Sequence, residues 1–294
     1  MNYFANKNKN IDHAKFIVNY METNFKDMIN QSIDNTKFIT SEPKMSVKAF
    51  CYTSNNFPFI ELNACDPVTA LFNERRLGGN DSRIAILNFA SFKNPGGMFL
   101  YGSMAQEEFL CHHSSLYNVL AGYEEKYKTY YCINRKNTNH ALYYNRMLYS
   151  PDILFTDKML NKYNESEDNG FVKADVITCA APNTSVYIRY YDPEMKDFQK
   201  IYEVIKSRIE FIISIVSCFG IDTLILGAYG CGVFGNDPSL IASLFIDSLI
   251  QHNACFRKII FAIPTSEASA IYNYNYKAFS EVLFEKEKEM KKWV

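Results

Sequence analysis

Short apolar runs separated by helical segments are the feature that most constrains the fold of this chain. Runs of strand length cover residues 59–62, 83–90, 172–180, 222–228 and 258–263. They lack the apolar–polar alternation of a strand with one wet face, so the strands are expected to be buried on both sides. Such strands alternating with helices predict a largely parallel or mixed sheet that is covered by helices on both faces.

Helical spacing of apolar residues fills the intervals between these runs. Asp66 before Pro67, and Asp237 before Pro238, are expected to start helices, because aspartate is a good N-cap and proline suits the first helical position. Gly220 is expected just after the end of a helix. We expect helices over about residues 12–31, 106–120, 193–219, 237–252 and 274–288.

Three segments have weaker patterns. Residues 1–12 are rich in Asn and Lys and are expected to be frayed. Residues 1–48 are interpreted as an N-terminal helical extension of a domain that covers 49–294. The segment 123–172 is rich in Tyr, Asn and Lys, and it is interpreted as a possible insertion or cap with long loops.

Composition narrows the class of protein. The chain has 294 residues, of which 48% are hydrophobic, so it can bury the core of one large domain. A net charge of −1 without a basic stripe argues against sequence-specific nucleic-acid binding. The polar N-terminus resembles no secretion signal, and the longest apolar stretch, 211–219, is too short to span a bilayer. We therefore expect a monomer without membrane contact in the cell interior, cytoplasmic or, in a eukaryote, nuclear.

Cysteine and histidine spacing gives no metal motif. The eight cysteines form no C-x-x-C pair, and we interpret most of them as reduced core residues. His112 and His113 are adjacent, so on a helix they point about 100° apart and make a poor chelate. No H-E-x-x-H motif or cluster of carboxylates occurs. No metal and no cofactor is expected.

A glycine-containing loop follows the apolar run 83–90. Glycines let the backbone approach a ligand closely, because no Cβ stands in the way. Taken alone, the loop is equally consistent with an ordinary strand–helix turn whose acidic residues favour the helix dipole. The loop and the first helical turn after it contain Gly96, Gly97, Gly102, Gln106, Glu107 and Glu108.

A second glycine-rich loop lies between the run 222–228 and the helix that begins at Pro238. Its four glycines fall between Gly227 and Gly235. Successive N–H groups in such a loop form an anion nest, and the following helix N-terminus adds positive charge, which suits a diphosphate. The spacing is neither that of a P-loop nor G-x-G-x-x-G. Because ligands bind at the carboxyl ends of strands, we expect both loops to face one crevice.

These motifs, in this order, resemble the microbial (bacterial-type) poly(ADP-ribose) glycohydrolases. The family signature is three glycines, a short spacer and Gln-Glu-Glu, and residues 95–98 (Pro-Gly-Gly-Met) followed by 106–108 closely match it. The resemblance covers about residues 50–285. It implies a macrodomain-like fold, a three-layer α/β/α mixed sheet, with a cleft for ADP-ribose. Further matches lie at residues 87–91, 110–117, 149–152, 178–183 and 226–234.

The resemblance also implies the roles of individual residues. Glu108 is the acid and then the base in hydrolysis of a ribose–ribose bond, and Glu107 orients the substrate. Gly96 and Gly97 wrap the distal ribose, while Phe234 packs on a ribose. Residues 230–234 cradle the diphosphate, and Asn183 faces the adenine. The remaining ligand-binding residues are expected to be Asn88, Ser91, Asn94, Gln106, Gly230, Cys231, Gly232 and Val233.

Met98 departs from the signature, since it stands where the third glycine belongs. Either this position has a negative φ and room for a side chain, or the loop approaches the ribose differently. The answer sets the geometry near the distal ribose.

Three functions fit these residues. The first is a poly(ADP-ribose) glycohydrolase that releases ADP-ribose, from chain ends as the family resemblance indicates. The second is a hydrolase of mono-ADP-ribose on protein or nucleic acid, with the same loops and a cleft more open beyond the distal ribose. The third is a non-catalytic reader of ADP-ribose, which Met98 favours and the intact pair of Glu107 and Glu108 disfavours. The expected partners are ADP-ribose, its polymer and ADP-ribosylated acceptors.

Overall fold

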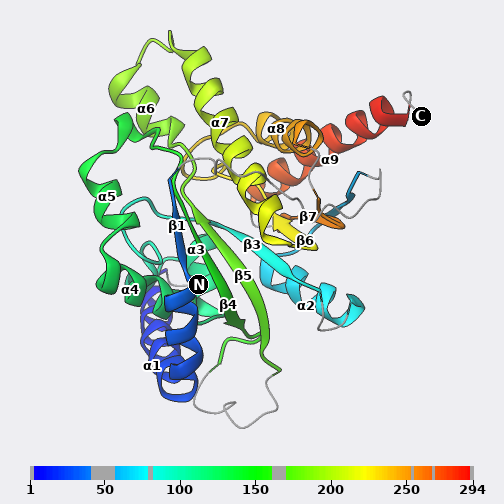
Figure 1. Cartoon of the computed structure of the whole chain (residues 1–294). Coiled ribbons are helices and arrows are strands. Elements are labelled where there is room, and N and C mark those ends of the chain that lie inside the picture. The colour runs from blue at the N-terminus through cyan, green and yellow to red at the C-terminus, as the bar shows by residue number, and fades with distance from the viewer. Residues whose placement is uncertain are drawn as a thin grey trace.

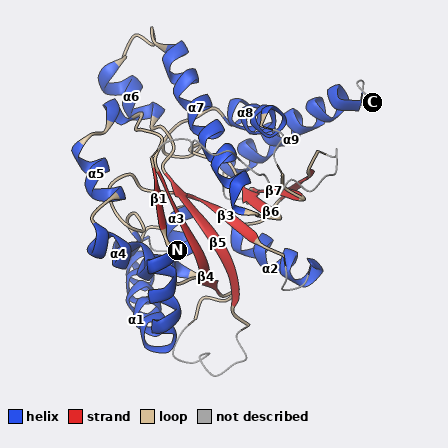
Figure 2. Cartoon of the chain, viewed as in Figure 1, coloured by secondary structure: helices blue, strands red, loops and turns tan. Residues whose placement is uncertain are grey.

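A computed structural model describes residues 3–40, 57–78, 82–160, 170–252, 255–266 and 269–291. One sheet of seven strands runs through these residues, with helices on both faces (Figures 1 and 2). The strands are β1 (Lys37–Ile39), β2 (Phe59–Asn63), β3 (Ile84–Phe89), β4 (Met147–Phe155), β5 (Val172–Cys179), β6 (Thr223–Leu226) and β7 (Lys258–Ala262). The helices are α1 (Tyr3–Asn35), α2 (Pro67–Gly78), α3 (Gln106–His112), α4 (Leu116–Tyr127), α5 (Tyr130–Lys136), α6 (Thr184–Tyr191), α7 (Phe198–Val216), α8 (Pro238–Gln251) and α9 (Ala270–Lys291), with short 3₁₀ turns η1 (Phe99–Tyr101), η2 (Asn139–Ala141) and η3 (Ser217–Phe219).

The sheet is mixed, in the order β1-β4-β5-β3-β6-β7-β2. Strands β5, β3, β6, β7 and β2 are parallel, whereas β4 runs antiparallel to β5 and β1 antiparallel to β4. The central strand β3 pairs with β5 on one side and with β6 on the other. The loops that follow these three strands therefore leave the sheet at the same edge.

Alternate residues of each buried strand enter two separate cores. In β3, Ala85 and Leu87 pack in the core beneath α7 and α8, while Ile84 and Ile86 pack in the core beneath α1 and α4. Because successive side chains of a strand point to opposite faces, this division makes three layers. The three-layer α/β/α fold expected from the sequence is confirmed.

The N-terminal segment is more ordered and more closely integrated than its composition predicts. Helix α1 begins at residue 3, so the expectation of a frayed segment over residues 1–12 is wrong from that residue onward. Its residues Ala14, Ile17 and Met21 are buried in the same core as α4, and the two helices lie side by side in Figure 1. The next element, β1, joins the sheet by pairing with β4. The expected domain boundary at residues 48 and 49 lies outside the described residues.

The segment 123–172 also differs from the expectation of long loops. It contributes α5 and β4, and β4 is paired on both sides, with β1 and with β5. Nearly every residue of β4 is buried. The sequence pattern did not predict this strand, because its apolar residues are interrupted by Ser150, Pro151 and Asp152 at a β-bulge.

Two expected helices have different bounds in the structure. The helix expected over 106–120 is interrupted at Ser114 and Ser115, which bond to Phe155 and Leu154 of β4. The helix expected over 193–219 begins only at Phe198, after the separate helix α6. The predicted caps are confirmed: Asp66 accepts from the N–H of Thr69, Asp237 from that of Leu240, and Gly220 is left-handed with φ 67°.

The described part of the chain contains seven of the eight cysteines, and Cys51 lies outside it. Three of them, Cys111, Cys179 and Cys231, are buried, as expected for small core residues. None of the helices in these residues is long and apolar enough to cross a membrane.

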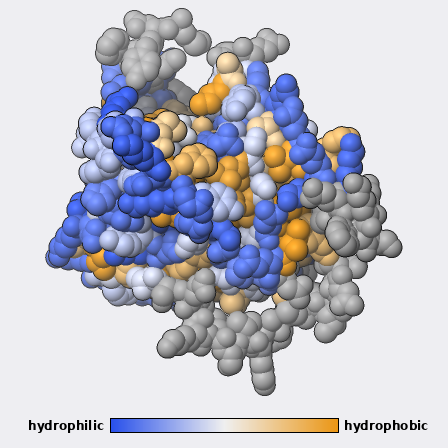
Figure 3. All heavy atoms as spheres, turned by 90° about the horizontal axis from the view of Figure 1, so that it is seen from above, coloured by the Kyte–Doolittle hydropathy of each residue, from blue (hydrophilic) through white to orange (hydrophobic). Residues whose placement is uncertain are grey.

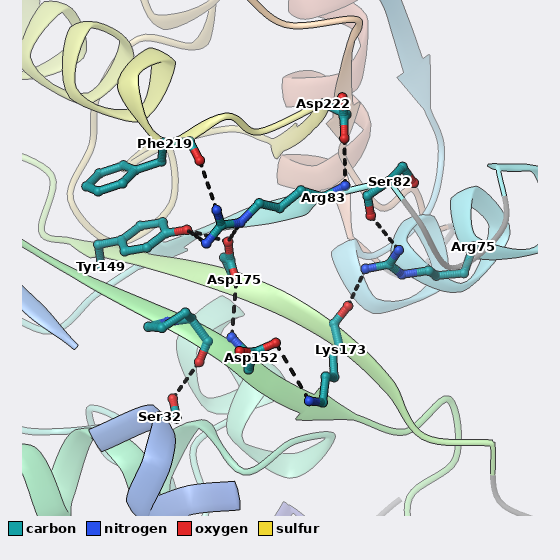
Figure 4. Close-up of polar contacts among 11 residues, drawn as sticks. Ser32, Arg75, Ser82, Arg83, Tyr149, Asp152, Lys173, Asp175, Phe219 and Asp222 are labelled. Carbon is teal, nitrogen blue, oxygen red and sulfur yellow. Dashed lines mark hydrogen bonds and ion pairs between the residues drawn. The ribbon is translucent and has the colours of Figure 1, made fainter. Parts of the chain in front are cut away.

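The amino edge of the parallel strands is fixed by a network around Arg83 (Figure 4). The Arg83 guanidinium donates to Asp175 at 2.7 Å and to the Tyr149 hydroxyl at 2.8 Å. The Asp222 carboxylate accepts from the backbone N–H of Arg83 at 2.7 Å. This network ties β3, β4 and β5 together at the edge opposite to the glycine loops.

Candidate active site at the carboxyl edge of the sheet

The two glycine-rich loops meet at the carboxyl edge, as the sequence predicts. Phe89, at the end of β3, packs edge-on against Tyr229 of the second loop, with ring centroids 5.6 Å apart. A Cβ on Gly227 would lie 3.1 Å from the Phe89 ring, so the loops approach closely there. Figure 3 views the molecule from above this edge and shows apolar residues gathered near the middle of the face, between hydrophilic areas.

Glu107 is the more constrained of the two glutamates at the start of α3. Its side chain is 3% exposed. One carboxylate oxygen accepts from Asn88 Nδ2 at 3.2 Å, and the other accepts from the backbone N–H of Ser91 at 2.6 Å. Burial raises the pKa of Glu107 to about 8, although these hydrogen bonds act in the opposite direction. The Glu107 carboxyl group is therefore largely protonated at neutral pH.

Glu108 has one engaged and one free oxygen. The side chain is 6% exposed, and its Oε1 accepts from the backbone N–H of Met98 at 2.9 Å. Its Oε2 is buried and has no hydrogen-bond partner among the described residues. Buried carboxylate oxygens are normally paired, so an unpaired one beside a glycine loop marks a position for a ligand group.

The glycines of the first loop leave room for these carboxylates. Gly97 has φ 59°, and a Cβ there would lie 2.4 Å from Glu108 Oε1. Gly96 has φ 64°, and its Cβ would lie 2.8 Å from the Tyr117 ring. Met98 has φ −106°, and its side chain is 49% exposed. The first of the two alternatives for Met98 therefore holds: the backbone accepts a side chain that points outward.

Two residues expected to touch the ligand also hold the site together. The Gln106 amide accepts from the N–H of Phe89 at 2.8 Å and donates to the carbonyl of Leu87 at 2.9 Å, so it fixes α3 to the end of β3. Asn88 is fully buried and donates to Glu107 and to Thr178. These bonds occupy both ends of the Gln106 amide and both donor positions of Asn88.

Asn183, Ser91 and Asn94 lie in turns around the cleft. Asn183 caps α6, since its side-chain oxygen accepts from the N–H of Val186 at 3.0 Å. The Ser91 hydroxyl accepts from the N–H groups of Lys93 and Asn94, which shapes the first loop, and Asn94 itself is exposed. The hydroxyl and the two asparagines thus have structural partners or solvent around them in the unliganded chain.

The second loop has the form of an anion cradle. Gly230 has φ 74°, and a Cβ there would collide with Asn236 and Ala181. The loop is closed by bonds from the N–H groups of Gly235 and Asn236 to the carbonyls of Gly232 and Gly230. Within the described ranges, no acceptor is bonded to the backbone N–H groups of Gly232, Val233 and Phe234.

The surroundings of this loop refine the expected anion site. Cys231 is buried, while the Val233 side chain is 87% exposed. Asp237 occupies the start of α8 with its own carboxylate. This charge offsets the positive helix end, so the attraction for an anion lies in the loop N–H groups rather than in the helix dipole.

A third wall is formed by residues 137–146, within the segment interpreted as a possible cap, although the sequence did not predict its shape. The Tyr143 ring stacks on Phe92 of the first loop at 3.7 Å, and it packs edge-on against Phe234 of the second loop at 6.4 Å. This turn has four left-handed residues with φ between 46° and 69°, namely Asn139, His140, Ala141 and Tyr143. Only asparagine and histidine among them favour such a conformation, so little in the sequence could have revealed the turn.

The histidines face the N-terminal helix rather than the cleft. His112 is fully buried, and its Nδ1 lies 2.7 Å from Nδ1 of His13 on α1. His113 contacts the carbonyl of Thr156 at 3.1 Å. Across the described residues, no group of three or more His, Cys, Asp or Glu side chains is arranged to hold a metal ion.

Fold and site together define a macrodomain-like α/β/α protein with a glutamate-bearing cleft between two glycine loops. Residues 5–157, just over half of the chain, match the family model described as the microbial-type PARG catalytic domain. The chain belongs to this family. The comparison with curated proteins finds no match.

Solved structures agree with this assignment. Poly(ADP-ribose) glycohydrolase from Deinococcus radiodurans, in complex with ADP-ribose, is 27% identical with a TM-score of 0.71, over 87% of this chain and 97% of that chain. The enzyme from Thermomonospora curvata is 24% identical with a TM-score of 0.74, over 94% and 99% of the two chains. The same enzyme bound to the inhibitor ADP-HPD gives a TM-score of 0.72 at 24% identity, over 93% and 99%. The likeness to the Thermomonospora enzyme shows the fold alone.

Proposed function

We propose that this chain is a poly(ADP-ribose) glycohydrolase that hydrolyses ribose–ribose O-glycosidic bonds and releases ADP-ribose from chain ends. The observation that carries the proposal is the free, buried Oε2 of Glu108, beside Gly97 and at the edge that the second loop shares. The family and the ADP-ribose complex of the Deinococcus relative support it.

The loops divide the substrate between them. The free N–H groups of Gly232, Val233 and Phe234 receive the diphosphate, because successive unbonded N–H groups attract anions. Gly96 and Gly97 admit the distal ribose, since neither position has a Cβ in the way. The Phe234 ring, supported by Tyr143, packs against the sugar. This places the anomeric carbon next to Glu108.

Glu108 performs the proton transfers. Its protonated Oε2 donates to the leaving ribose oxygen as the bond from that oxygen to the anomeric carbon breaks, which leaves an oxocarbenium-like centre. The resulting Glu108 carboxylate accepts a proton from water, and the water oxygen bonds to the anomeric carbon. Glu107, held by Asn88 and Ser91, is neutral near pH 7 and adds no second negative charge beside the diphosphate.

A timed digest of polymer by the wild type and by Glu108→Gln tests the mechanism. Glutamine keeps an oxygen for the N–H of Met98 but has no acidic proton to transfer to the leaving oxygen, so the release of ADP-ribose should fall by about 10²- to 10⁴-fold. Binding of ADP-ribose should persist. Glu125→Gln, an exposed change on α4, is the matched control and should keep the wild-type rate. A wild-type rate in Glu108→Gln would overturn the mechanism.

A comparison of turnover on polymer and on singly modified acceptors identifies the substrate class. Turnover of polymer should exceed turnover of singly modified protein or nucleic acid. The reverse order would assign the chain as a mono-ADP-ribosyl hydrolase, and tight ADP-ribose binding without cleavage of any acceptor would assign it as a reader. A monomeric state and a location in the cell interior stay predictions.

A further inference from the structure

Arg208 is a buried cation without a counter-charge. It lies on α7, and its side chain is 1% exposed. Nε donates to the side-chain oxygen of Asn145 at 2.8 Å, and one terminal nitrogen donates to the carbonyl of Ala180. The other terminal nitrogen, Nη2, has no hydrogen-bond partner among the described residues. No carboxylate within these residues pairs with Arg208, so both of its acceptors are neutral.

Such an arrangement is costly, because a buried charge is normally paired. Two other deeply buried charged groups follow that rule: Glu74 is bonded to Arg257 and Lys258, and Asp175 to Arg83. A neutral donor would suffice to satisfy the carbonyl of Ala180. Folding alone therefore does not explain why the side chain at position 208 is positively charged.

The guanidinium lies beneath the cleft. It is bonded to the carbonyl of Ala180, directly after β5, and the Tyr229 hydroxyl is bonded to the preceding carbonyl, that of Cys179, at 3.1 Å. Tyr229 leads directly into the second glycine loop at Gly230. Ala180 itself packs in one small cluster with Phe92, Tyr143 and Phe234, the aromatic residues of all three cleft walls. Arg208 thus supports the floor on which both loops rest.

We propose that Arg208 supplies the counter-charge for the diphosphate of the ligand, by acting through the low-dielectric floor of the cleft rather than by touching the phosphates. This inference rests on the proposed function for the identity of the ligand. In a buried setting an uncompensated charge acts over a longer range than it does in water. The diphosphate then supplies the negative charge that no described side chain bonded to Arg208 provides.

Binding of ADP-ribose and of adenosine, which has no phosphate, separates this role from a structural one. In Arg208→Met the affinity for ADP-ribose should fall by about tenfold or more, a loss of about 1.4 kcal/mol, while the affinity for adenosine stays the same. Lys206→Met, which removes a half-exposed cation from the same helix, is the matched control and should change neither affinity. Equal losses for both ligands, or no loss, would overturn the inference.

Asn145→Asp provides a second test, which does not depend on the folding of Arg208→Met. It places a carboxylate beside Nε at nearly unchanged shape; the Ser207 hydroxyl can donate to it, whereas the bond to the Ser207 carbonyl is lost. Thermal stability should hold or rise because the buried cation gains a partner, while ADP-ribose affinity should fall. A purely structural role predicts that stability and affinity move together. An intact fold with unchanged ADP-ribose affinity would contradict the proposal.

The two proposals fail in different ways. A wild-type chain that binds ADP-ribose but leaves polymer intact would overturn the proposed hydrolysis alone. A chain that cleaves polymer while Arg208→Met keeps the wild-type ratio of ADP-ribose to adenosine affinity would overturn the role of Arg208 alone. Absence of ADP-ribose binding in the wild type would overturn both.

Discussion

The Glu108 carboxylate occupies the space that a side chain at position 97 would fill. Its position therefore requires glycine at position 97. A methyl group at position 97 would have to occupy a point 2.4 Å from Glu108 Oε1, on a backbone with φ 59°. Both the collision and the strained φ follow from the single added carbon. The free oxygen of Glu108 therefore depends on a residue that carries no functional group.

Gly97→Ala should consequently abolish most polymer cleavage, by about 10²-fold or more, because Glu108 must leave its position. Initial rates of ADP-ribose release measure this effect. Gly170→Ala is the control, since no atom lies within 4 Å of a Cβ there. An active Gly97→Ala variant would show that the carboxylate tolerates displacement.

Glu107 should make the stability of the protein fall as pH rises. Its pKa is about 8 in the folded chain, above the ordinary value of 4.5. The stability contributed by its protonated form is fully present below pH 4.5 and is lost as pH rises through 8, at up to about 1.4 kcal/mol per pH unit. In urea unfolding at pH 5, 6.5 and 8, the free energy of unfolding of Glu107→Gln should increase relative to that of the wild type as the pH rises. A constant difference across these values would refute the assignment.

At the scale of elements, α1 fixes the first glycine loop and α3 from outside. The side chain of Asn10 donates to the carbonyl of Gly102 at 3.2 Å, and a Cβ on Gly102 would lie 2.6 Å from the carbonyl of Lys7. His13 meets His112 at the other end of α3. The N-terminal helix is thus a structural part of the site, although no residue of it was expected there.

The contact between α1 and α3 should weaken in acid. Burial lowers the pKa of His13 to about 4 and that of His112 to about 3, and it also lowers the pKa of the neighbouring His113. For a base with a depressed pKa, stability is present above the ordinary value of 6.5 and is lost as pH falls through the folded value.

Urea unfolding between pH 7 and pH 4 should therefore show a decline in stability that is shallower in His112→Phe. His140→Gln, which changes an exposed histidine, should leave the wild-type slope unaltered. Parallel slopes in the wild type and His112→Phe would exclude the histidine pair as the cause.

The elements that sequence reasoning found and missed differ in physical origin. The strands at 84–89, 172–179, 223–226 and 258–262 were predicted because burial on both faces forces continuous apolar runs. Strand β4 was missed because a β-bulge interrupts its pattern, and β1 because it is short. The break between α3 and α4 comes from bonds of Ser114 and Ser115 to β4, a tertiary contact that local propensity does not encode.

The candidate site, like the fold, was predicted in part from the sequence. Glycines and glutamates at strand ends identified both loops, because backbone geometry limits those positions to few residue types. The supporting roles of Gln106 and Asn88, the contacts of Tyr143 within the expected cap segment, and the buried Arg208 were missed. Each of these depends on partners distant in the sequence, and Gln106 and Asn88 bond to structural groups rather than to solvent.

Across the whole molecule, the carboxyl edge of the sheet carries the candidate site, and the amino edge carries contacts that stabilise the fold. The carboxyl edge carries glycines with positive φ, the unpaired Oε2 of Glu108 and the unpaired Nη2 of Arg208. The amino edge carries satisfied ion pairs, with Arg83 bonded to Asp175, Tyr149 and Phe219 (Figure 4). Function and stability should therefore respond to different substitutions.

Arg83→Met should lower the free energy of unfolding by about 2 kcal/mol, less than the ~3–5 kcal/mol of a fully buried pair because Arg83 is half exposed. The kcat/KM on polymer should stay within about twofold at a temperature where the variant is folded. A large loss of kcat/KM in the folded variant would show that the two edges are coupled.

The most direct measurement of the central claim is a crystal structure of Glu108→Gln with ADP-ribose bound. We predict that the diphosphate oxygens accept from the N–H groups of Gly232, Val233 and Phe234, and that the distal ribose lies against Gly97 with its anomeric carbon next to the side chain of residue 108. A diphosphate bound away from the second loop, or a distal ribose beyond reach of residue 108, would contradict the account.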